Sequence, residues 1–389
     1  MYYHELAGVK VSALGMGNMR LPKIEGQGEK IDREQAQKII DYAMSHGITY
    51  YDTAYRYHGG ESELFLGEAL TKYPRDQYLL ASKFPGHMME KKGNGVLGFT
   101  SMLAGHPDST VADVFAEQLQ KCRAEYFDFY LLHNVTEKSI PFYEDPEVQV
   151  IEYLQEQKRQ GRIRHLGFSS HAVSPATIDA FLTRHEGVFE FVQIQLNYLD
   201  WKLQDAKGKV EAIAKHGLKI VVMESIRGGR LANLPEAQMS RLQAVRKDDS
   251  AARWALRWLQ SIPEVAVVLS GMSTLDQIIE NVETFKQPDP VSEDERKLLG
   301  EVADAMLSWV PCTACRYCTE GCPMELNIPG IIAAYNGVRN GDHMAKYNPD
   351  AADPSMDPRR CIGCGACASI CPQGIKIPEI MPEFAGMLA

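Results

Sequence analysis

The sequence predicts an α/β protein in which a (β/α)8 barrel is followed by a smaller cysteine-rich domain. Two observations lead to this prediction. Through about the first three quarters of the 389 residues, β-branched or aromatic runs alternate with amphipathic helical stretches, in about eight strand–helix units, the count of such a barrel. Eight of the nine cysteines then gather after residue 310. We therefore expect a barrel over residues 1–290 and, over residues 291–389, a linker helix with a small second domain.

The barrel strands are expected at eight runs rich in β-branched and aromatic residues. In chain order these are VSALGMG, ITYYD, QYLLASK, DFYLLH, IRHLGFS, FVQIQL, LKIVVME and VAVVLSG. Helices are expected between them, for example at REQAQKIIDYAMSHG, TVADVFAEQLQKCRAEY and SAARWALRWLQS, and Gly47 and Gly217 stand where helix C-caps would fall. An open doubly wound sheet is the alternative, but the first strand–helix turn lacks the G-x-G-x-x-G loop of that fold.

Composition favours a cytoplasmic protein that binds neither membrane nor nucleic acid. No apolar run reaches the roughly 18–20 residues that a membrane span needs, and MYYHELAGVK lacks the basic start and apolar core of a signal peptide. A net charge of −10 with mixed signs argues against nucleic acid as a partner. Cys122 stands apart from the other cysteines and is expected to be a packed core thiol.

Two cysteine runs predict metal clusters. CTACRYCTEGCP (312–323) and CIGCGACASICP (361–372) both follow the C-x2-C-x2-C-x3-C-P spacing of two-cluster ferredoxins, in which the fourth cysteine usually serves the other cluster. Zinc or disulfides are the alternatives, but zinc sites usually take two C-x-x-C pairs. We therefore expect two [4Fe-4S] clusters, one held by Cys312, Cys315, Cys318 and Cys371 and the other by Cys361, Cys364, Cys367 and Cys322. The segment PVSEDERKLLGEVADAMLSWVP is expected to be the helix leading into this domain.

Candidate catalytic residues follow the second, third and fourth predicted strands. Active sites of (β/α)8 barrels lie at the carboxyl ends of the strands. Asp52 ends the second strand and leads to Tyr57, Lys83 ends the third, and His133 ends the fourth. Each residue alone has an ordinary structural explanation, such as a cap, a packed ring or a solvated strand end. Their joint placement at one rim favours an active site.

The motifs around these residues resemble those of the aldo-keto reductases. GITYYDTAYRYHGGESELFLGEAL, YLLASKF, EYFDFYLLHN and GFSS occur in this order, and the resemblance covers roughly residues 1–290. It implies a catalytic tetrad of Asp52, Tyr57, Lys83 and His133, including the five-residue step from Asp to Tyr. The cysteine-rich segment resembles the α-helical ferredoxin domain that some members carry, and the segment between its two runs is long enough for a helix and a loop.

The implied chemistry is carbonyl reduction, which needs a hydride at carbon and a proton at oxygen. Tyr57 could give the proton if its pKa fell from about 10 toward the working pH. Lys83, held by Asp52, could lower that pKa, and His133 would orient the substrate oxygen. Tyr55 lies two residues away and is the rival proton donor.

The resemblance also implies a nicotinamide cofactor across the same rim. Ser169 and Gln193 would bind its carboxamide, and MESIRGGRL after the seventh strand would wrap the pyrophosphate. Ser170 stands where many members have asparagine, and Glu224 where an aromatic ring often stacks on the nicotinamide. The other residues expected to contact the cofactor are Met223, Ser225, Arg227, Gly229, Ser270, Gly271, Gln277 and Asn281.

The loop and helix after the eighth strand predict a preference for NADH. LSGMSTLDQIIEN contains no Lys or Arg, and Gly271 and Gln277 stand where NADPH-preferring members have basic residues. Asp276 and Glu280 would repel a 2′-phosphate. The alternative is that Arg227 or Arg230 supplies the missing positive charge.

Two functions remain open at this stage. The first is a nicotinamide-dependent oxidoreductase that reduces a carbonyl or oxidises an alcohol, coupled to or assisted by its clusters. In that case the clusters are structural, or they exchange electrons with the substrate site or with a redox partner protein. The second is an electron-transfer or redox-sensing protein that uses the barrel to dock a partner or a flavin. Clusters pass single electrons and nicotinamide passes hydride, so a flavin at the nicotinamide position is a further candidate cofactor, although no separate flavin motif is found. The loop at residues 85–108 is expected to be a lid or binding surface, with Met88, Met89 and Met102 lining the substrate site or packing the loop.

Overall fold

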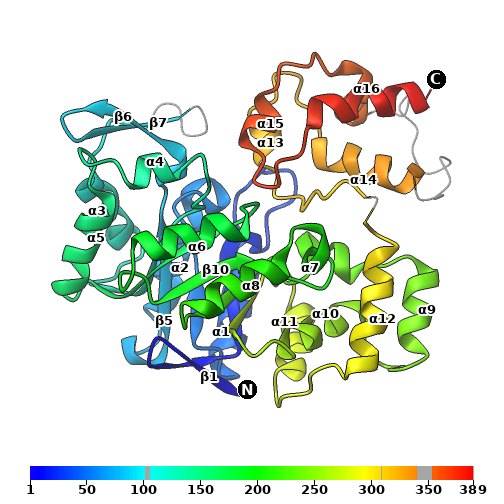
Figure 1. Cartoon of the computed structure of the whole chain (residues 1–389), viewed down its shortest axis with the longest axis horizontal. Coiled ribbons are helices and arrows are strands. Elements are labelled where there is room, and N and C mark those ends of the chain that lie inside the picture. The colour runs from blue at the N-terminus through cyan, green and yellow to red at the C-terminus, as the bar shows by residue number, and fades with distance from the viewer. Residues whose placement is uncertain (101–105, 308, 340–352, 389) are drawn as a thin grey trace. The chain divides into compact units, whose positions relative to one another are not determined.

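The computed structural model describes residues 1–100, 106–307, 309–339 and 353–388, which fall into two compact units. The first unit, Met1–Ile226 with Leu231–Gly300, contains a closed barrel of eight parallel strands, as predicted (Figure 1). Each strand pairs with the next one along the chain, and the last pairs with the first. The strands are β3 (Leu14–Gly17), β4 (Tyr50–Asp52), β5 (Leu79–Phe84), β8 (Phe127–Leu132), β9 (Ile163–Ser170), β10 (Phe191–Gln195), β11 (Lys219–Met223) and β12 (Val265–Ser270).

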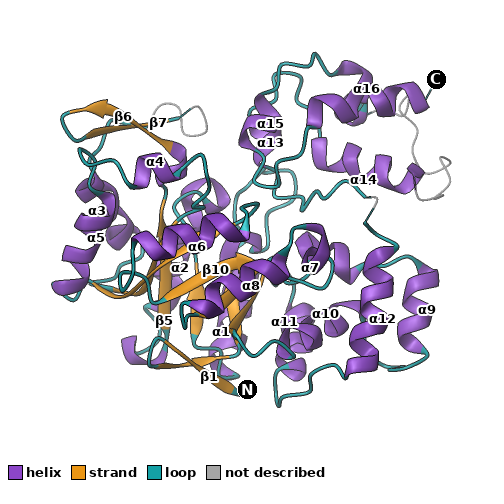
Figure 2. Ribbon diagram, viewed as in Figure 1, coloured by secondary structure: helices purple, strands orange, loops and turns teal. Residues whose placement is uncertain are grey.

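One main helix follows each barrel strand, and these helices surround the strands (Figure 2). Their apolar faces are buried, as the periodicity of the sequence predicts; in the second of the expected helices, for example, Val111, Val114 and Phe115 are buried. Gly47 and Gly217, which follow the first and sixth of these helices, have the positive φ of helix-ending glycines. The helices are α1 (Arg33–Ser45), α2 (Glu61–Leu70), α3 (Val111–Lys121), α5 (Val150–Arg159), α6 (Pro175–Arg184), α8 (Ala206–Lys215), α10 (Ala251–Gln260) and α11 (Leu275–Thr284).

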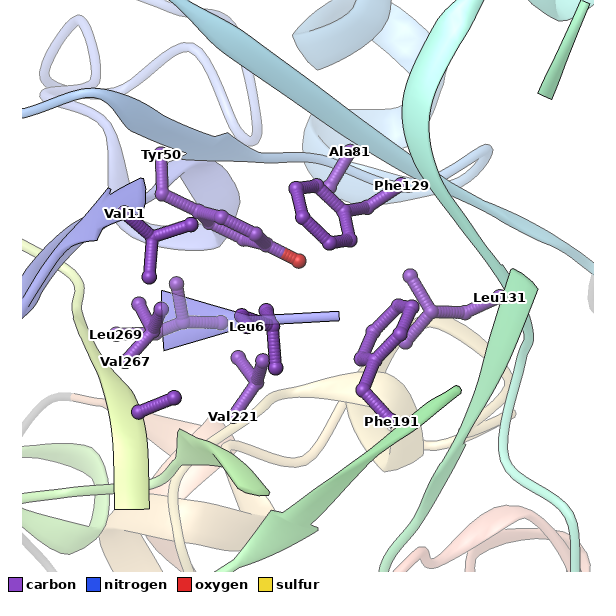
Figure 3. Close-up of a cluster of buried hydrophobic side chains, with 11 residues drawn as sticks. Leu6, Val11, Tyr50, Ala81, Phe129, Leu131, Phe191, Val221, Val267 and Leu269 are labelled. Carbon is purple, nitrogen blue, oxygen red and sulfur yellow. The ribbon is translucent and has the colours of Figure 1, made fainter. Parts of the chain in front are cut away.

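An amino-terminal hairpin contributes to the core of the barrel. The expected first strand VSALGMG is divided at Ala13: β2 (Val9–Ser12) pairs with β1 (Tyr3–Leu6), and only β3 joins the barrel. Leu6 and Val11 of the hairpin lie among side chains that the barrel strands point inward (Figure 3). The complete cluster is Leu6, Val11, Tyr50, Ala81, Phe129, Leu131, Phe191, Val221, Ala266, Val267 and Leu269.

Shorter elements lie in the loops between strands and helices. The long loop after β5 forms a hairpin of β6 (Met89–Gly93) and β7 (Val96–Phe99). Met88 and Met89 are buried, and Met102 lies outside the described residues. The remaining short segments of the barrel part of the chain are η1 (Asn18–Arg20), η2 (Tyr57–Gly60), η3 (Arg75–Gln77), η4 (Gly86–Met88), α4 (Ile140–Tyr143), α7 (Asp200–Leu203), η6 (Arg227–Ala232) and α9 (Glu236–Gln243).

The second unit comprises Glu301–Ala389 together with the four residues Arg227–Arg230. Helix α12 (Glu293–Asp304), expected as the linker, runs from one unit into the other. The described part of this unit is mainly helical, as predicted, with its own apolar core around Ile331, Ile332 and Met381. No helix in the described ranges is long and apolar enough to cross a membrane. The elements of the unit are α13 (Tyr317–Glu320), α14 (Ile328–Arg339), η8 (Pro354–Met356), η9 (Pro358–Arg360), α15 (Ala366–Ile370) and α16 (Ile377–Met387).

Candidate active site and iron–sulfur sites

A buried ion pair lies at the carboxyl end of the barrel. Asp52 is the last residue of β4, and Lys83 lies near the end of the neighbouring strand β5. The Lys83 ammonium donates hydrogen bonds to Asp52 Oδ1 at 2.6 Å and to the Thr53 carbonyl oxygen at 2.8 Å. Burial lowers the pKa of Lys83, and the Asp52 carboxylate partly offsets this effect. The two side chains therefore hold each other in place beneath the rim.

Tyr57 is the third member of this group. It begins η2, is 8% exposed, and its hydroxyl oxygen accepts a hydrogen bond from Lys83 Nζ at 3.3 Å. Burial, followed by the charges of Asp52 and Glu224, raises the pKa of Tyr57 well above its usual value. We expected Lys83 to lower this pKa. The structure gives the opposite direction, because burial and the two carboxylates penalise the phenolate more than the charge of Arg20 favours it.

The rival phenol, Tyr55, is bonded elsewhere. Its hydroxyl donates a hydrogen bond to Glu117 Oε2 at 2.8 Å, and its ring stacks on Phe99 of β7. The Lys121 ammonium lies 4.1 Å from the ring centroid. Tyr55 therefore contacts α3 and the β6–β7 hairpin, whereas Tyr57 contacts the Asp52–Lys83 pair.

His133, the fourth expected residue, follows directly after β8. Its ring centroid lies 6.2 Å from that of Tyr57, in an edge-on arrangement. Burial, and then the nearby His87 and Lys83, lower its pKa well below the usual value. The imidazole is therefore neutral at physiological pH and carries one N–H donor. The structure thus brings all four expected residues to one place at the rim.

Two further histidines adjoin His133, and our sequence reasoning missed both. His87 lies in η4 after β5, with its ring centroid 4.5 Å from that of His133. His171 follows β9 directly and interacts electrostatically with both of these rings. The signal that could have revealed them is positional, because each histidine comes within three residues of the end of a barrel strand.

The residues expected at the nicotinamide carboxamide lie on two neighbouring strands. Ser169 of β9 and Gln193 of β10 are opposite each other in the strand register, and both are almost fully buried. The side-chain oxygen of Gln193 is buried without a hydrogen-bond partner in the described structure, as an amide awaiting a ligand would be. Ser170 differs, because its hydroxyl donates a hydrogen bond to the Val135 carbonyl oxygen at 2.6 Å.

The residues expected along the rest of the cofactor follow β11 and β12. Ser225 donates to the Leu269 carbonyl oxygen at 2.8 Å and so links the end of β11 to β12, while Asn281 of α11 donates to Ser270 Oγ at 3.0 Å and links that helix to β12. Gln277 Oε1 accepts a hydrogen bond from the Ser273 amide at 2.8 Å. Met223 ends β11, and Glu224, directly after it, has a positive φ of 56°.

Arg20 is a basic residue near this segment that our sequence reasoning did not consider. A Cβ atom placed on Gly271 would lie 3.0 Å from Arg20 Cβ, and the Arg20 carbonyl oxygen accepts a hydrogen bond from Ser273 Oγ at 2.6 Å. Arg20 thus lies beside the loop after β12. No local motif indicates this contact, because Arg20 and Gly271 lie 251 positions apart in the sequence.

The other two expected cations belong to a segment that groups with the second unit. Arg227–Arg230, which includes Gly229, is assigned to that unit. There, Arg230 Nη1 donates to the Val310 carbonyl oxygen at 2.9 Å, and its guanidinium lies 5.1 Å from the Trp309 ring centroid. Burial, and then the charge of Arg227, lower the pKa of Arg230 to about 10. In this arrangement Arg230 is bonded within its own unit.

The cysteines of the second unit surround two hollows. Both hollows are lined by cysteines together with apolar side chains such as Ile377. Each brings together three cysteines of one run with the fourth cysteine of the other run, which is the expected grouping. Thiolates are the usual ligands of [4Fe-4S] clusters, so the donor set of each hollow fits one. The first set is Cys312, Cys315, Cys318 and Cys371, and the second is Cys322, Cys361, Cys364 and Cys367.

Comparisons with known families agree with this architecture. A model of the aldo/keto reductase family matches residues 13–303, and a model of the 4Fe-4S dicluster domain matches residues 311–375. Because the first match covers well over half of the sequence, the chain belongs to the aldo/keto reductase family. The second match shows that a 4Fe-4S dicluster domain follows the barrel, which confirms the resemblance on both counts.

Individual relatives are more distant. The chain is similar to the NADH-specific methylglyoxal reductase of Escherichia coli (strain K12), with 24% identity over 329 residues that cover 77% of this chain and 96% of that protein. It is 25% identical to the L-galactose dehydrogenase of Arabidopsis thaliana over 308 residues, 75% of this chain and 89% of that one. Among solved structures, the holo form of an aldo-keto reductase from Bacillus halodurans matches with 27% identity and a TM-score of 0.59, covering 78% and 96%. The chain is therefore an oxidoreductase of this family with an iron–sulfur domain.

Proposed function

We propose that the protein is a nicotinamide-dependent oxidoreductase that reduces a small carbonyl compound to an alcohol, with NADH as the preferred cofactor. The observation that carries this proposal is the buried contact of Lys83 Nζ with Asp52 Oδ1 at 2.6 Å and with the Tyr57 hydroxyl at 3.3 Å. A phenol beside a fixed ammonium at a barrel rim is suited to proton transfer to a substrate oxygen.

The raised pKa of Tyr57 suits the reducing direction. Because the phenol stays protonated throughout the physiological pH range, it is ready to donate a proton. His133 is neutral and would donate a hydrogen bond to the substrate oxygen, but it would have to become an imidazolate to give up its proton. We therefore assign proton donation to Tyr57, orientation of the carbonyl to His133, and positioning of the phenol to Lys83 with Asp52.

Ser169 and Gln193 would hold the carboxamide of the cofactor, since both are buried on adjacent strands and Gln193 Oε1 lacks a partner in the described structure. When bound, the nicotinamide supplies the hydride for the carbonyl carbon, while the proton from Tyr57 completes the alcohol. The E. coli relative named as NADH-specific supports the same cofactor here. The hydride and the proton together supply everything that the reduction of the carbonyl needs, so the reaction itself does not require electrons from the iron–sulfur domain.

The iron–sulfur domain is proposed to connect the enzyme with a redox partner protein. The two cysteine quartets would hold two [4Fe-4S] clusters, which supply one-electron transfer when bound. The alternative is a redox protein in which the barrel only docks a partner or a flavin. That alternative predicts no carbonyl turnover dependent on Tyr57.

The test is the variant Tyr57→Phe, assayed with NADH and a series of small aldehydes such as methylglyoxal. We expect carbonyl turnover to fall by about 10²-fold or more, within the range of general acid catalysis, while the Kd for NADH changes little. Tyr55→Phe is the matched control and should keep most of the activity, because the Tyr55 hydroxyl bonds to Glu117. Full activity of Tyr57→Phe would refute the assignment of the proton donor.

A further inference from the structure

Two arginines that follow β11 in the chain belong to the second unit. They begin and end the short segment Arg-Gly-Gly-Arg at residues 227–230. Arg227, Gly228 and Gly229 have positive φ angles of 49°, 64° and 93°, a conformation that glycine adopts at little cost. The turn brings Arg227 close enough to Arg230 for the two positive charges to repel each other. Two like charges brought together favour a negative group beside them.

The carbonyl oxygen of Val310 connects Arg230 with Cys312. This oxygen accepts hydrogen bonds from Arg230 Nη1 at 2.9 Å, from the Cys312 amide at 2.8 Å and from Asn336 Nδ2 at 3.0 Å. Asn336 Oδ1 in turn accepts a hydrogen bond from the Val310 amide at 2.7 Å. The guanidinium of Arg230 also lies 5.1 Å from the Trp309 ring centroid. Arg230 is therefore fixed where the chain enters the first cysteine run.

The charges of both arginines act on the first cysteine of this run. Arg230 and Arg227 each interact electrostatically with Cys312 and favour its thiolate form. A guanidinium stays protonated in proteins, so these positive charges are permanent. Arg227 is fully buried, and solvent therefore screens its charge only weakly. Cys312 lines the first hollow, whose cysteines are Cys312, Cys315, Cys318 and Cys371.

The two hollows differ in their exposure to solvent. Cys318 of the first hollow is buried, and its other three cysteines are partly buried. The second hollow contains the exposed Cys364, and Ile362 beside it is 64% exposed. Charges act more strongly where water screens them less. A fixed cation is therefore expected to have a larger effect at the first hollow.

We propose that Arg230, assisted by Arg227, raises the reduction potential of the [4Fe-4S] cluster that the first hollow would hold. Reduction adds one electron, and hence one negative charge, to a cluster bound by four thiolates. A nearby guanidinium stabilises this additional charge, so it favours the reduced state over the oxidised state. Arg230 would thus act on the cluster through its charge and not as a ligand. This inference does not depend on the proposed carbonyl reduction.

The test is an anaerobic redox titration of the protein purified with its clusters, followed by EPR spectroscopy. Cys371→Ser, which changes one ligand of the first hollow, identifies the potential that belongs to that cluster. Arg230→Gln keeps a donor for the Val310 carbonyl oxygen but removes the charge. In this variant the equilibrium constant for reduction of the first cluster should fall about tenfold, equivalent to about 59 mV for one electron. Arg230→Lys keeps the charge and should retain most of the wild-type potential.

The matched control is Arg339→Gln. Arg339 also belongs to the second unit, lies 5.4 Å from the ring centroid of Tyr335 and donates a hydrogen bond to the hydroxyl of that residue at 3.2 Å. It is exposed, so solvent screens its charge, and the potentials of both clusters should stay at their wild-type values. Iron and sulfide analysis of every variant distinguishes a change in potential from the loss of a cluster.

Two results would overturn the inference directly. One is an unchanged first potential in Arg230→Gln, and the other is an equal fall in Arg230→Gln and Arg230→Lys, which would indicate a structural effect. If Arg230→Gln loses iron from the first hollow, Asn336→Asp decides instead. Its carboxylate would stand beside the same carbonyl oxygen and offset the charge of Arg230, so the first potential should again fall. An unchanged potential in Asn336→Asp, or a wild-type protein without clusters, would refute the proposal.

Discussion

Glu190 illustrates how one residue makes stability depend on pH. It directly precedes β10 and accepts hydrogen bonds from Lys158 Nζ, from His165 Nδ1 at 3.1 Å and from the Leu166 amide at 3.1 Å. Burial alone would raise the pKa of Glu190, but the hydrogen bonds from His165 and Lys158 outweigh it and lower the pKa to about 2. The folded protein therefore binds this proton less readily than the unfolded chain does.

The contribution of Glu190 to stability should be present above its unfolded pKa of about 4.5 and lost as pH falls toward 2. We expect Glu190→Gln to lower the free energy of unfolding by on the order of 2 kcal/mol at pH 7, and by much less at pH 3. Urea titrations at the two pH values measure this difference. Glu152→Gln, on the exposed side of α5, is the control. Equal effects of Glu190→Gln at both pH values would contradict the prediction.

Cofactor preference is a second question for single residues. The segment after β12 carries Asp276 and Glu280 and no basic residue, so a 2′-phosphate would be repelled there. We expect NADH to bind at least several-fold more tightly than NADPH in fluorescence titrations. Arg20, which lies beside Gly271, is a further candidate, next to Arg227 and Arg230, for supplying positive charge there. If NADPH binds more tightly, Arg20→Ala should reduce the affinity for NADPH more than that for NADH, and Arg227→Ala and Arg230→Ala follow as the next variants.

Close packing of two helices depends on Gly67 of α2. A Cβ atom at this position would lie 2.4 Å from the Lys121 carbonyl oxygen and 2.6 Å from the Cys122 carbonyl carbon, at the end of α3. These are backbone atoms, so they cannot move aside without shifting the helix. The side chain of Cys122 is itself buried, as expected of a core thiol.

We therefore expect Gly67→Ala to lower the free energy of unfolding by about 1–3 kcal/mol, or more, as measured by urea denaturation. Gly300→Ala in α12 is the matched control, because a Cβ atom there meets nothing within 4 Å. It should stabilise the protein by about 0.5–1 kcal/mol, since alanine favours a helix interior over glycine. A Gly67→Ala protein as stable as the wild type would show that α2 and α3 can separate at little cost.

The eight barrel strands could be predicted because each has a local signal, a short run of β-branched or aromatic residues. The division of VSALGMG into two strands could not be predicted. It depends on which strands the two halves pair with: β2 pairs with β1, whereas β3 pairs with β12. The β6–β7 hairpin had a usable signal: Asn94 and Gly95, with φ of 52° and 73°, form the Asn-Gly turn typical of two-residue hairpin loops.

The four candidate catalytic residues could be located from the sequence, because each lies in a short motif at or just after the end of a predicted strand. The surroundings of the tetrad were harder to predict. The raised pKa of Tyr57 depends mainly on its burial in the folded barrel, and the contact of Arg20 with Gly271 depends on closure of the barrel between β12 and β3. His87 and His171 have no motif of their own. They become significant only when β5, β8 and β9 are known to be neighbours.

At the scale of the whole molecule, the main prediction concerns metal content. Anaerobically purified protein should contain about eight irons and eight acid-labile sulfides per chain, because each hollow is lined by four cysteines. Cys371→Ser should disturb mainly the cluster shared with Cys312, Cys315 and Cys318, so iron should fall toward about four. Cys122→Ser should leave the content unchanged. Stoichiometric zinc without sulfide would refute the prediction, and flavin analysis of the same sample tests the alternative docking function.

Each hollow takes its fourth cysteine from the other run, Cys371 in the first hollow and Cys322 in the second. This sharing determines when each set of ligands becomes complete during synthesis of the chain. The ribosome synthesises the chain from the amino terminus, so all eight barrel strands, which end at Ser270, emerge before Cys361 or Cys371. Until then the first hollow lacks one ligand and the second lacks three. Neither set of four cysteines is therefore complete until all barrel residues have left the ribosome. A cell starved of iron would accumulate chains with a complete barrel and eight unprotected thiols.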